Sequence, residues 1–327
     1  MVVPSPMMTE PWTGPQAWRA DAGTVRNEWY YELPADAEEE LDRAVRRLAE
    51  EAESPTEACA DKFDLVACRR ALRPVSAALE CGRGFAIVVG PPIEKYSTRE
   101  HQIAYWLIGQ LLGRPIVQNV QGTLLYDVRD TGQDVRYGAR FSVTNAESTF
   151  HTDASFGDEV CDYVGLQCLR TAKSGGMSQM VSAYAVHNVL LDEQPDALET
   201  LYRPFHVDRR GGVRPGEGPT IERPVFEWSG GELLCRYLRY WIEVGNEKAG
   251  QPLTSEQVHA LDALDRVAAR PELRVEFHLR PGDLYFLNNR WLMHNRTAFE
   301  DHAEPEQKRH LVRLWLRRSD AKQGSPQ

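Results

Sequence analysis

Apolar positions in the first third of the chain recur at helical spacing on either side of one short apolar run. Within residues 36–53, four apolar side chains share one face of a predicted helix: Leu41, Ala44, Val45 and Leu48. The run over residues 85–89 lies between glycines, which is typical of a buried strand that ends in a turn. Ser97 and Glu100 form a capping-box pattern, which predicts a second helix that ends near Gly113. We therefore expect a helical layer over residues 31–115.

Beyond residue 117 the pattern changes to short strand-like runs. Residues 117–168 contain β-rich runs punctuated by Gly and Asp, and strands are predicted again over 284–287 and 310–316. Helical spacing returns in three stretches: 182–191, 195–202 and 254–268. The pattern predicts a mainly β core over residues 117–320, with helices inserted into it and packed outside it.

The domain organisation follows from length and from these patterns. A chain of 327 residues is long enough for one or two domains. Residues 1–30 contain four prolines and little periodicity, so we expect a loosely tied arm there. No internal repeat interrupts the rest. We predict a single domain over residues 31–327.

Composition and charge exclude several partners. The formal net charge is −10 and no run of basic residues occurs, so nucleic acid is not an expected partner. No apolar run reaches membrane-spanning length and the N-terminus lacks a signal-peptide pattern, which predicts a cytoplasmic protein without a membrane anchor. The six cysteines form no CxxC pair, so we expect buried, reduced thiols.

A His-x-Asp/Glu spacing occurs three times and is the first sign of chemistry. The three pairs are His151/Asp153, His206/Asp208 and His302/Glu304. On a strand, residues i and i+2 point to the same face and can bind one ion. A second histidine from elsewhere would complete a two-histidine, one-carboxylate face, an arrangement that suits non-haem Fe(II). The spacing alone does not choose among the pairs. The strand-rich context favours His151, and surface or hydrogen-bonded histidines are the simpler interpretation of the other two.

Four motifs occur in an order that resembles a known family. They are His151-Thr-Asp-Ala-Ser-Phe156, Ser174-Gly-Gly-Met-Ser178, the segment from Pro281-Gly-Asp283 to His294-Asn-Arg296, and Arg309-His-Leu-Val-Arg313. Together they resemble the taurine dioxygenase-like (TauD/TfdA) family of Fe(II)- and 2-oxoglutarate-dependent dioxygenases, to which γ-butyrobetaine hydroxylase and clavaminate synthase are related. The resemblance implies a double-stranded β-helix core, a cupin-like jelly roll, with flanking helices.

The resemblance also implies roles for particular residues. His151, Asp153 and His294 are expected to bind the iron. Ser178 and Arg309 are expected to hold the distal carboxylate of 2-oxoglutarate, a task suited to the planar fork of arginine. Arg313 corresponds to a family position close to the substrate or to the keto-acid end of the cosubstrate. The chain departs from the family at one position, because Asn295 stands where glycine usually follows the second histidine.

The substrate is less constrained by the sequence. Candidate contacts lie before the first histidine and in the aromatic run near residue 240: Asn145, Glu147, Tyr237, Arg239 and Tyr240. The aromatic faces would suit a cation, whereas the arginines would suit an acidic or amino-acid substrate. Helical spacing offers a simpler alternative, in which part of this run is the core face of a short helix. We expect a small polar metabolite, for example an amino-acid derivative.

The implied reaction consumes O2 and 2-oxoglutarate, releases succinate and CO2, and oxidises an unactivated C–H bond, most simply to an alcohol. Desaturation and ring closure remain open as outcomes. Two alternatives of other classes are a non-catalytic metal- or metabolite-binding protein on the same barrel and a zinc hydrolase. Many members of the family self-associate, so a homo-oligomer is also open.

Overall fold

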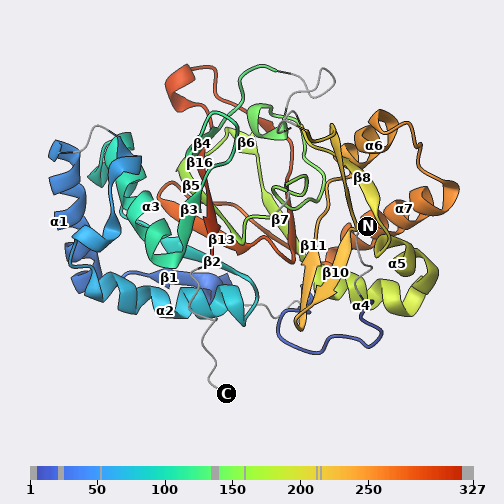
Figure 1. The fold of residues 1–327 in the computed structure, drawn as a ribbon. Coiled ribbons are helices and arrows are strands. Elements are labelled where there is room, and N and C mark those ends of the chain that lie inside the picture. The colour runs from blue at the N-terminus through green and yellow to red at the C-terminus, as the bar shows by residue number, and fades with distance from the viewer. Residues whose placement is uncertain are drawn as a thin grey trace.

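Two β-sheets packed face to face form the centre of the molecule (Figure 1). The computed structural model describes residues 6–20, 26–51, 54–133, 140–157, 160–210, 213 and 216–318. Tyr285 of the larger sheet and Phe277 of the smaller one have ring centroids 5.2 Å apart. The hydroxyl of Tyr285 also lies 3.5 Å from Sδ of Met180 in the smaller sheet. One hydrophobic core therefore fills the space between the sheets.

The larger sheet has seven strands and joins segments from the whole chain. In spatial order they are β1 (Tyr30–Glu32), β2 (Phe85–Val89), β13 (Asp283–Asn288), β5 (Tyr163–Arg170), β16 (His310–Arg317) and β3 (Arg114–Ile116), with β4 (Leu125–Val128) also paired to β16. β1 and β2 are parallel and the other pairs are antiparallel. The strands predicted over 85–89, 284–287 and 310–316 are confirmed.

The two faces of this sheet bury different neighbours. Along β13, Leu284 and Phe286 belong to the core beneath the helical layer, whereas Tyr285 and Leu287 belong to the core between the sheets. This alternation follows the two-residue period of a strand. Because both faces are covered, β13 is buried at every position and is continuously apolar in sequence from residue 284 to 287.

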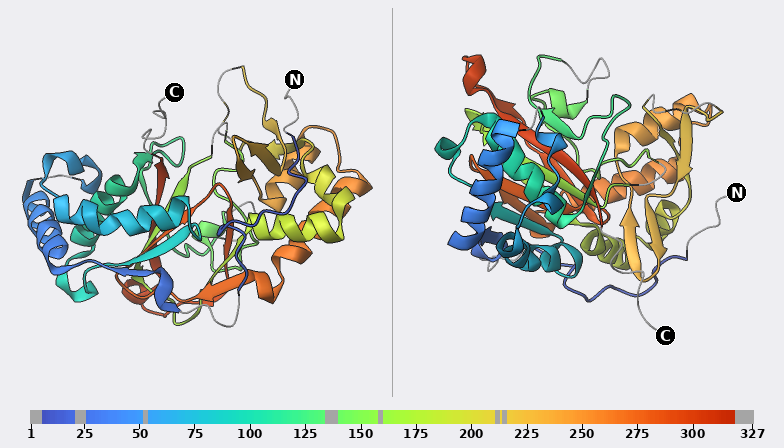
Figure 2. Two further views of the ribbon diagram at one scale, coloured as in Figure 1. Left: turned by 90° about the horizontal axis from the view of Figure 1, so that it is seen from below. Right: turned by 60° about the vertical axis from the view of Figure 1, so that its left-hand side comes forward.

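Three helices cover the outer face of the larger sheet: α1 (Ala35–Glu51), α2 (Val66–Glu80) and α3 (Thr98–Leu112). Figures 1 and 2 show this layer on the side of the sheet opposite to the remaining helices. The predicted capping box is present in α3, where Ser97 and Glu100 each accept a hydrogen bond from the other's backbone N–H. The sequence patterns gave no sign of α2, whose interior contains Pro74.

The smaller sheet and a second group of helices complete the fold. Its strands run in the order β12 (Arg274–Phe277), β7 (Ser178–Ser182) and β14 (Leu292–Arg296). The helices are α4 (Ala183–Glu193), α5 (Pro195–Leu201), α6 (Arg239–Lys248) and α7 (Ser255–Ala268). Two-stranded pairs accompany them: β8 (Phe205–Asp208) with β9 (Thr220–Arg223), β10 (Phe226–Ser229) with β11 (Glu232–Cys235), and β6 (Ser174–Gly175) with β15 (Phe299–Glu300). None of the helices in the described part of the chain combines the length and the apolar character that crossing a membrane requires.

Residues 6–20 are fastened to the body of the protein, which differs from the loosely tied arm expected over residues 1–30. The backbone N–H of Trp12 donates to Asn188 Oδ1, and Asn188 Nδ2 donates back to Trp12 O, both at 2.8 Å. The indole of Trp18 donates to the carbonyl of Arg83 at 2.8 Å. The hydrogen bonds of Trp12 and Trp18 attach this segment to the rest of the protein, although its sequence shows no helical or strand periodicity.

All six cysteines are free thiols, as expected. Four of them are buried, but Cys59 is half-buried and Cys81 is exposed. The expectation of burial therefore fails at these two positions, which lie at the ends of elements in the helical layer.

Gly84 provides a test of how tightly the core is packed. Its φ is +80°, and a Cβ placed there would lie 2.2 Å from the ring of Trp291, which is fully buried. We expect Gly84→Ala to lower the free energy of unfolding by about 2–5 kcal/mol, because left-handed strain and overpacking add together. Urea unfolding measures this. Gly122→Ala is the matched control, since its φ is +77° but no atom lies within 4 Å of the added Cβ. Equal losses in the two variants would contradict the tight contact with Trp291.

Candidate active site

Three side chains able to bind a metal converge between the two sheets. The potential ligand atoms of His151, Asp153 and His294 all lie within 4.8 Å of one another. His294 is in the middle of β14, and His151 pairs with it by two backbone hydrogen bonds of 3.0 and 2.9 Å. Nε2 of His151 is 3.8 Å from Oδ1 of Asp153. Among the described residues no other His, Cys, Asp or Glu cluster of this kind occurs.

The other two His-x-Asp/Glu pairs are not part of a comparable cluster within the described chain. Nε2 of His206 lies 3.6 Å from Glu222, across the β8–β9 hairpin. Asp208 accepts a hydrogen bond from Lys248 at 3.0 Å. The ambiguity that spacing left is thus resolved by the backbone pairing of His151 with His294, which local sequence does not reveal.

The Asp153 carboxylate is buried and held from two directions. Its Oδ2 accepts a hydrogen bond of 2.8 Å from the indole of Trp315 and lies 3.1 Å from Nη1 of Arg313. Its backbone N–H donates to Oδ1 of Asn289 at 2.7 Å. Burial alone would raise the pKa of Asp153, but Arg313 and its other neighbours outweigh burial and lower that pKa below its ordinary value. The carboxylate is therefore ionised and oriented.

The two histidines are held as neutral rings with a nitrogen available. Nδ1 of His151 lies 2.8 Å from the carbonyl of Thr149. A carbonyl only accepts, so Nδ1 carries the hydrogen and Nε2 keeps its lone pair. Burial lowers the pKa of His151 and brings that of His294 to about 3. Two neutral imidazoles and one carboxylate form a donor set that suits Fe(II).

A buried arginine lies farther along the same pocket. Arg309 and Ser178 both line it together with the three candidate ligands. Arg309 is 6% exposed, and its Nη1 has no hydrogen-bond partner in the described part of the chain. Burial lowers the pKa of Arg309 to about 10, so it stays charged at neutral pH. A buried cation with an unused donor is a site prepared for an anion.

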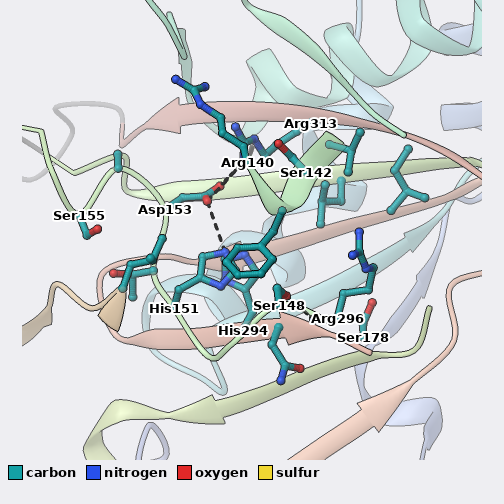
Figure 3. A pocket seen from close by; sticks show the side chains of 18 of the residues that line it. Arg140, Ser142, Ser148, His151, Asp153, Ser155, Ser178, His294, Arg296 and Arg313 are labelled. Atoms are coloured by element: carbon teal, nitrogen blue, oxygen red, sulfur yellow. Dashed lines mark hydrogen bonds and ion pairs between the residues drawn. The ribbon is translucent and has the colours of Figure 1, made fainter. Parts of the chain in front are cut away.

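Arg296 is a pocket residue that the sequence analysis did not single out. It follows His294 by two positions on β14, and Figure 3 shows it beside Ser178. Both Arg296 and Arg309 lie over the ring of Phe299, at 4.6 and 5.1 Å from its centroid. Burial, with the charge of Arg309 next, lowers the pKa of Arg296 to about 9. The signal was present in the His294-Asn-Arg296 motif, but only the fold brings the two arginines together.

Arg313 lines the pocket with its guanidinium already engaged. Besides the contact with Asp153, its Nε donates to Oε1 of Gln118 at 2.8 Å. In this structure the side chain therefore orients the candidate metal ligand. The expected contact of Arg313 with the cosubstrate remains a prediction.

The five candidate substrate residues lie outside the lining of this pocket. Tyr237 is buried and donates to Asp265 at 2.6 Å, and Arg239 pairs with acidic residues of α6 and α7. Asn145, Glu147 and Tyr240 are exposed. Their neighbours Ser148, Leu238 and Trp241 line the pocket instead. The candidates differ from the residues that line the pocket in side-chain direction, which depends on where α6 begins and on which face of it is buried. Their contact with a substrate remains a prediction.

Comparison with known proteins places this site in a family. The family described as taurine catabolism dioxygenase TauD, TfdA matches residues 44–315. The chain belongs to this family. It is an enzyme, a non-haem iron dioxygenase that depends on 2-oxoglutarate, as the motifs indicated.

Individual relatives extend the comparison. The chain is 30% identical over 322 residues to FR-33289 synthase of Streptomyces rubellomurinus, covering 97% of this chain and 93% of that protein. It is 32% identical over 190 residues to a uridine-5'-phosphate dioxygenase of an Amycolatopsis species, covering 57% and 66%. A solved asparagine oxygenase with Fe(II), 3-hydroxyasparagine and succinate superimposes with a TM-score of 0.67 at 20% identity, covering 88% and 93%. The fold is the expected jelly roll.

The hydrogen bond from Trp315 to Asp153 allows a test of how the carboxylate is oriented. We expect Trp315→Phe to weaken Fe(II) binding by about 10- to 100-fold, because the ring is kept while the donor to Oδ2 is lost. Anaerobic titration of Fe(II) into the metal-free protein measures the affinity. Trp228→Phe, a tryptophan outside the pocket lining, is the control. Unchanged iron affinity in Trp315→Phe would show that Arg313 alone orients Asp153.

Proposed function

We propose that this protein hydroxylates an unactivated C–H bond of a small polar metabolite, with Fe(II) held by His151, Asp153 and His294. The observation that carries the proposal is the convergence of these three ligand atoms in one pocket with Nη1 of Arg309, which has no hydrogen-bond partner among the described residues. A metal site and an anion site in one pocket are what an enzyme needs if it brings a carboxylate cosubstrate to iron.

The donor set fits Fe(II) in three respects. His151 has its Nδ1 occupied by Thr149, which directs Nε2 to a metal. Asp153 is ionised, and Trp315 and Arg313 fix its direction. Three protein ligands would leave the other coordination positions of the ion for small molecules.

Arg309 and Ser178 are the proposed partners of the distal carboxylate of 2-oxoglutarate, and Arg296 adds a second charge close to them. The guanidinium of Arg309 can form a paired, charge-assisted hydrogen bond with a carboxylate. Ser178, at the start of β7, can add a hydroxyl donor. The charge of Arg309 repels that of Arg296 and contributes to the lowered pKa of Arg296. A carboxylate bound between them would reduce this repulsion.

When bound, Fe(II) and 2-oxoglutarate supply the oxidising chemistry, in which O2 is consumed, 2-oxoglutarate becomes succinate and CO2, and one oxygen atom is transferred to the substrate. The protein's own contribution is to orient and to exclude water. Leu166, Leu311 and Tyr285 supply apolar lining around the charged groups. Such walls keep bulk water away and strengthen every electrostatic contact inside.

The substrate class is supported by the names of the relatives. An asparagine oxygenase and a uridine-5'-phosphate dioxygenase are named for an amino acid and a nucleotide, both small and polar. A substrate of this size is consistent with a pocket that lies between the sheets and is lined on one side by α6. No observation in the described residues favours the zinc hydrolase or the non-catalytic alternative.

The metal assignment predicts a spectroscopic signature. Anaerobic addition of Fe(II) and then 2-oxoglutarate should produce a weak visible charge-transfer band that requires both additions, and His151→Ala should abolish it. His206→Ala is the matched control, since His206 belongs to another His-x-Asp pair and lies outside the pocket lining. A band that survives in His151→Ala, or no band in the unmodified protein although iron binds, would contradict the proposal.

The cosubstrate assignment predicts a separate effect on affinity. Arg309→Gln should raise the dissociation constant for 2-oxoglutarate by about 10- to 100-fold, because a buried charge-assisted hydrogen bond is lost, while Fe(II) affinity stays the same. Titrating 2-oxoglutarate against the same band measures it. Arg309→Lys keeps the charge without the planar fork and should give an intermediate value. Equal affinity in all three proteins would rule out Arg309 as the carboxylate partner.

A further inference from the structure

We propose that Gln118 is a positioning residue for the iron site, because its side-chain amide holds the guanidinium of Arg313 where Arg313 orients the candidate ligand Asp153. This inference rests on the proposed function, in which Asp153 binds Fe(II). Gln118 belongs neither to the motifs that resemble the family nor to the lining of the pocket. It would therefore act on the metal through another side chain.

Gln118 lies in the connection between β3 and β4, two strands that both pair with β16. Its backbone N–H donates to the carbonyl of Thr123 at 2.9 Å. Oδ1 of Asn119 accepts from the backbone N–H groups of Gln121 and Thr123, both at 3.1 Å. The connection is thus a turn closed by its own hydrogen bonds, and it holds Gln118 beside Arg313 of β16.

The side-chain amide of Gln118 is buried and makes three hydrogen bonds. Gln118 is 3% exposed. Its Nε2 donates to the carbonyls of Leu124 and Arg313 at 2.8 and 2.9 Å, and its Oε1 accepts from Nε of Arg313 at 2.8 Å. Exchanging the amide oxygen and nitrogen would place an oxygen against two carbonyls, so only this orientation satisfies all three contacts. Gln118 therefore binds both the backbone and the side chain of Arg313.

The other contacts of Arg313 direct its outer nitrogen to Asp153. Nη1 of Arg313 lies 3.1 Å from Oδ2 and 3.3 Å from Oδ1 of Asp153. Its guanidinium carbon lies 5.1 and 4.9 Å from the ring centroids of Tyr126 and Trp315, at distances typical of cation–π contacts. With Nε bound by Gln118 and two aromatic rings in contact, Nη1 is held at the carboxylate.

The amide of Gln118 is uncharged, which suits this role. A carboxylate at the same position would compete with Asp153 for the guanidinium of Arg313. A neutral acceptor fixes Nε and leaves the positive charge to compensate the buried carboxylate of Asp153. Groups that hold a metal ligand in place affect metal affinity without touching the ion. Loss of the amide should therefore weaken Fe(II) binding.

The affinity for Fe(II) alone tests this role. Gln118→Met keeps a side chain of similar length but loses the amide donor and acceptor. Anaerobic titration of Fe(II) into the metal-free full chain should show binding about 10-fold weaker than in the unmodified protein. Gln118→Asn, whose amide is one methylene shorter, should lose affinity too, and it provides the measurement if Gln118→Met does not fold. At saturating Fe(II) the charge-transfer band with 2-oxoglutarate should form in both variants.

Two comparisons separate positioning from a general loss of stability. Gln110 of α3 makes similar contacts in the helical layer, where its Nε2 donates to the carbonyl of Ala58 at 3.0 Å and its Oε1 accepts from the N–H of Ala60 at 3.2 Å. Gln110→Met should lower the melting temperature and leave the Fe(II) affinity unchanged. In an Arg313→Lys background, which lacks the Nε–H donor, Gln118→Met should cause no further loss of affinity.

The failures are distinguishable. If the unmodified protein forms no band with Fe(II) and 2-oxoglutarate, the proposed function itself fails. If the band forms but both Gln118 variants bind Fe(II) as tightly as the unmodified protein, the inference is overturned and the proposed function remains. The inference is also overturned if Gln110→Met loses affinity to the same extent, or if Gln118→Met loses the same factor in the Arg313→Lys background.

Discussion

The buried carboxylate of Asp153 is the group on which the arrangement of the site depends. An ionised carboxylate removed from water must be compensated, and here Arg313 and Trp315 do so from one strand, while Asn289 holds the backbone of Asp153 from the β13–β14 turn. Both compensating side chains lie on the face of β16 that is turned toward the smaller sheet. The register of β16 against β5 therefore decides whether Asp153 can be ionised and oriented.

The same strand connects this requirement with the anion site. Arg309 lies just before β16, and the ladder is irregular between His310 and Leu311 before Arg313 and Trp315 follow on the pocket side. Arg313, which orients a candidate metal ligand, and Arg309, which is proposed to bind a carboxylate cosubstrate, are thus only four residues apart on the same stretch of chain. A strand buried on both faces gives such positions more rigidity than a loop would.

The pocket also shows how a net negative protein keeps a positive interior. Burial lowers the pKa values of Arg296 and Arg309 to about 9 and 10, which is a cost of charging them away from water. Both remain protonated at neutral pH, and a bound anion would offset part of the free-energy cost of burying their charges. Strands of both sheets supply the metal and cosubstrate side of this pocket, with His294 on β14, Ser178 on β7 and Arg313 on β16, whereas α6 and the segment after β8 supply Trp241 and Arg210.

Much of this could be predicted from sequence, because the signals concerned are local. The capping box at Ser97, the apolar run at β2 and the strand composition of β16 depend on near neighbours, and the ordered motifs identified the family and its chemistry. The sequence could not choose a histidine pair by spacing, since the decisive contact is the backbone bridge between His151 and His294. It also did not show which residues of this region line the pocket, because Tyr237 and Arg239 turn toward α7 while Leu238 and Trp241 turn toward the pocket. Which side of a segment faces a cavity is set by the elements packed around it, and those come from distant parts of the chain. Residue types and their order thus determined the reaction class, and tertiary packing decided which side chains share the pocket.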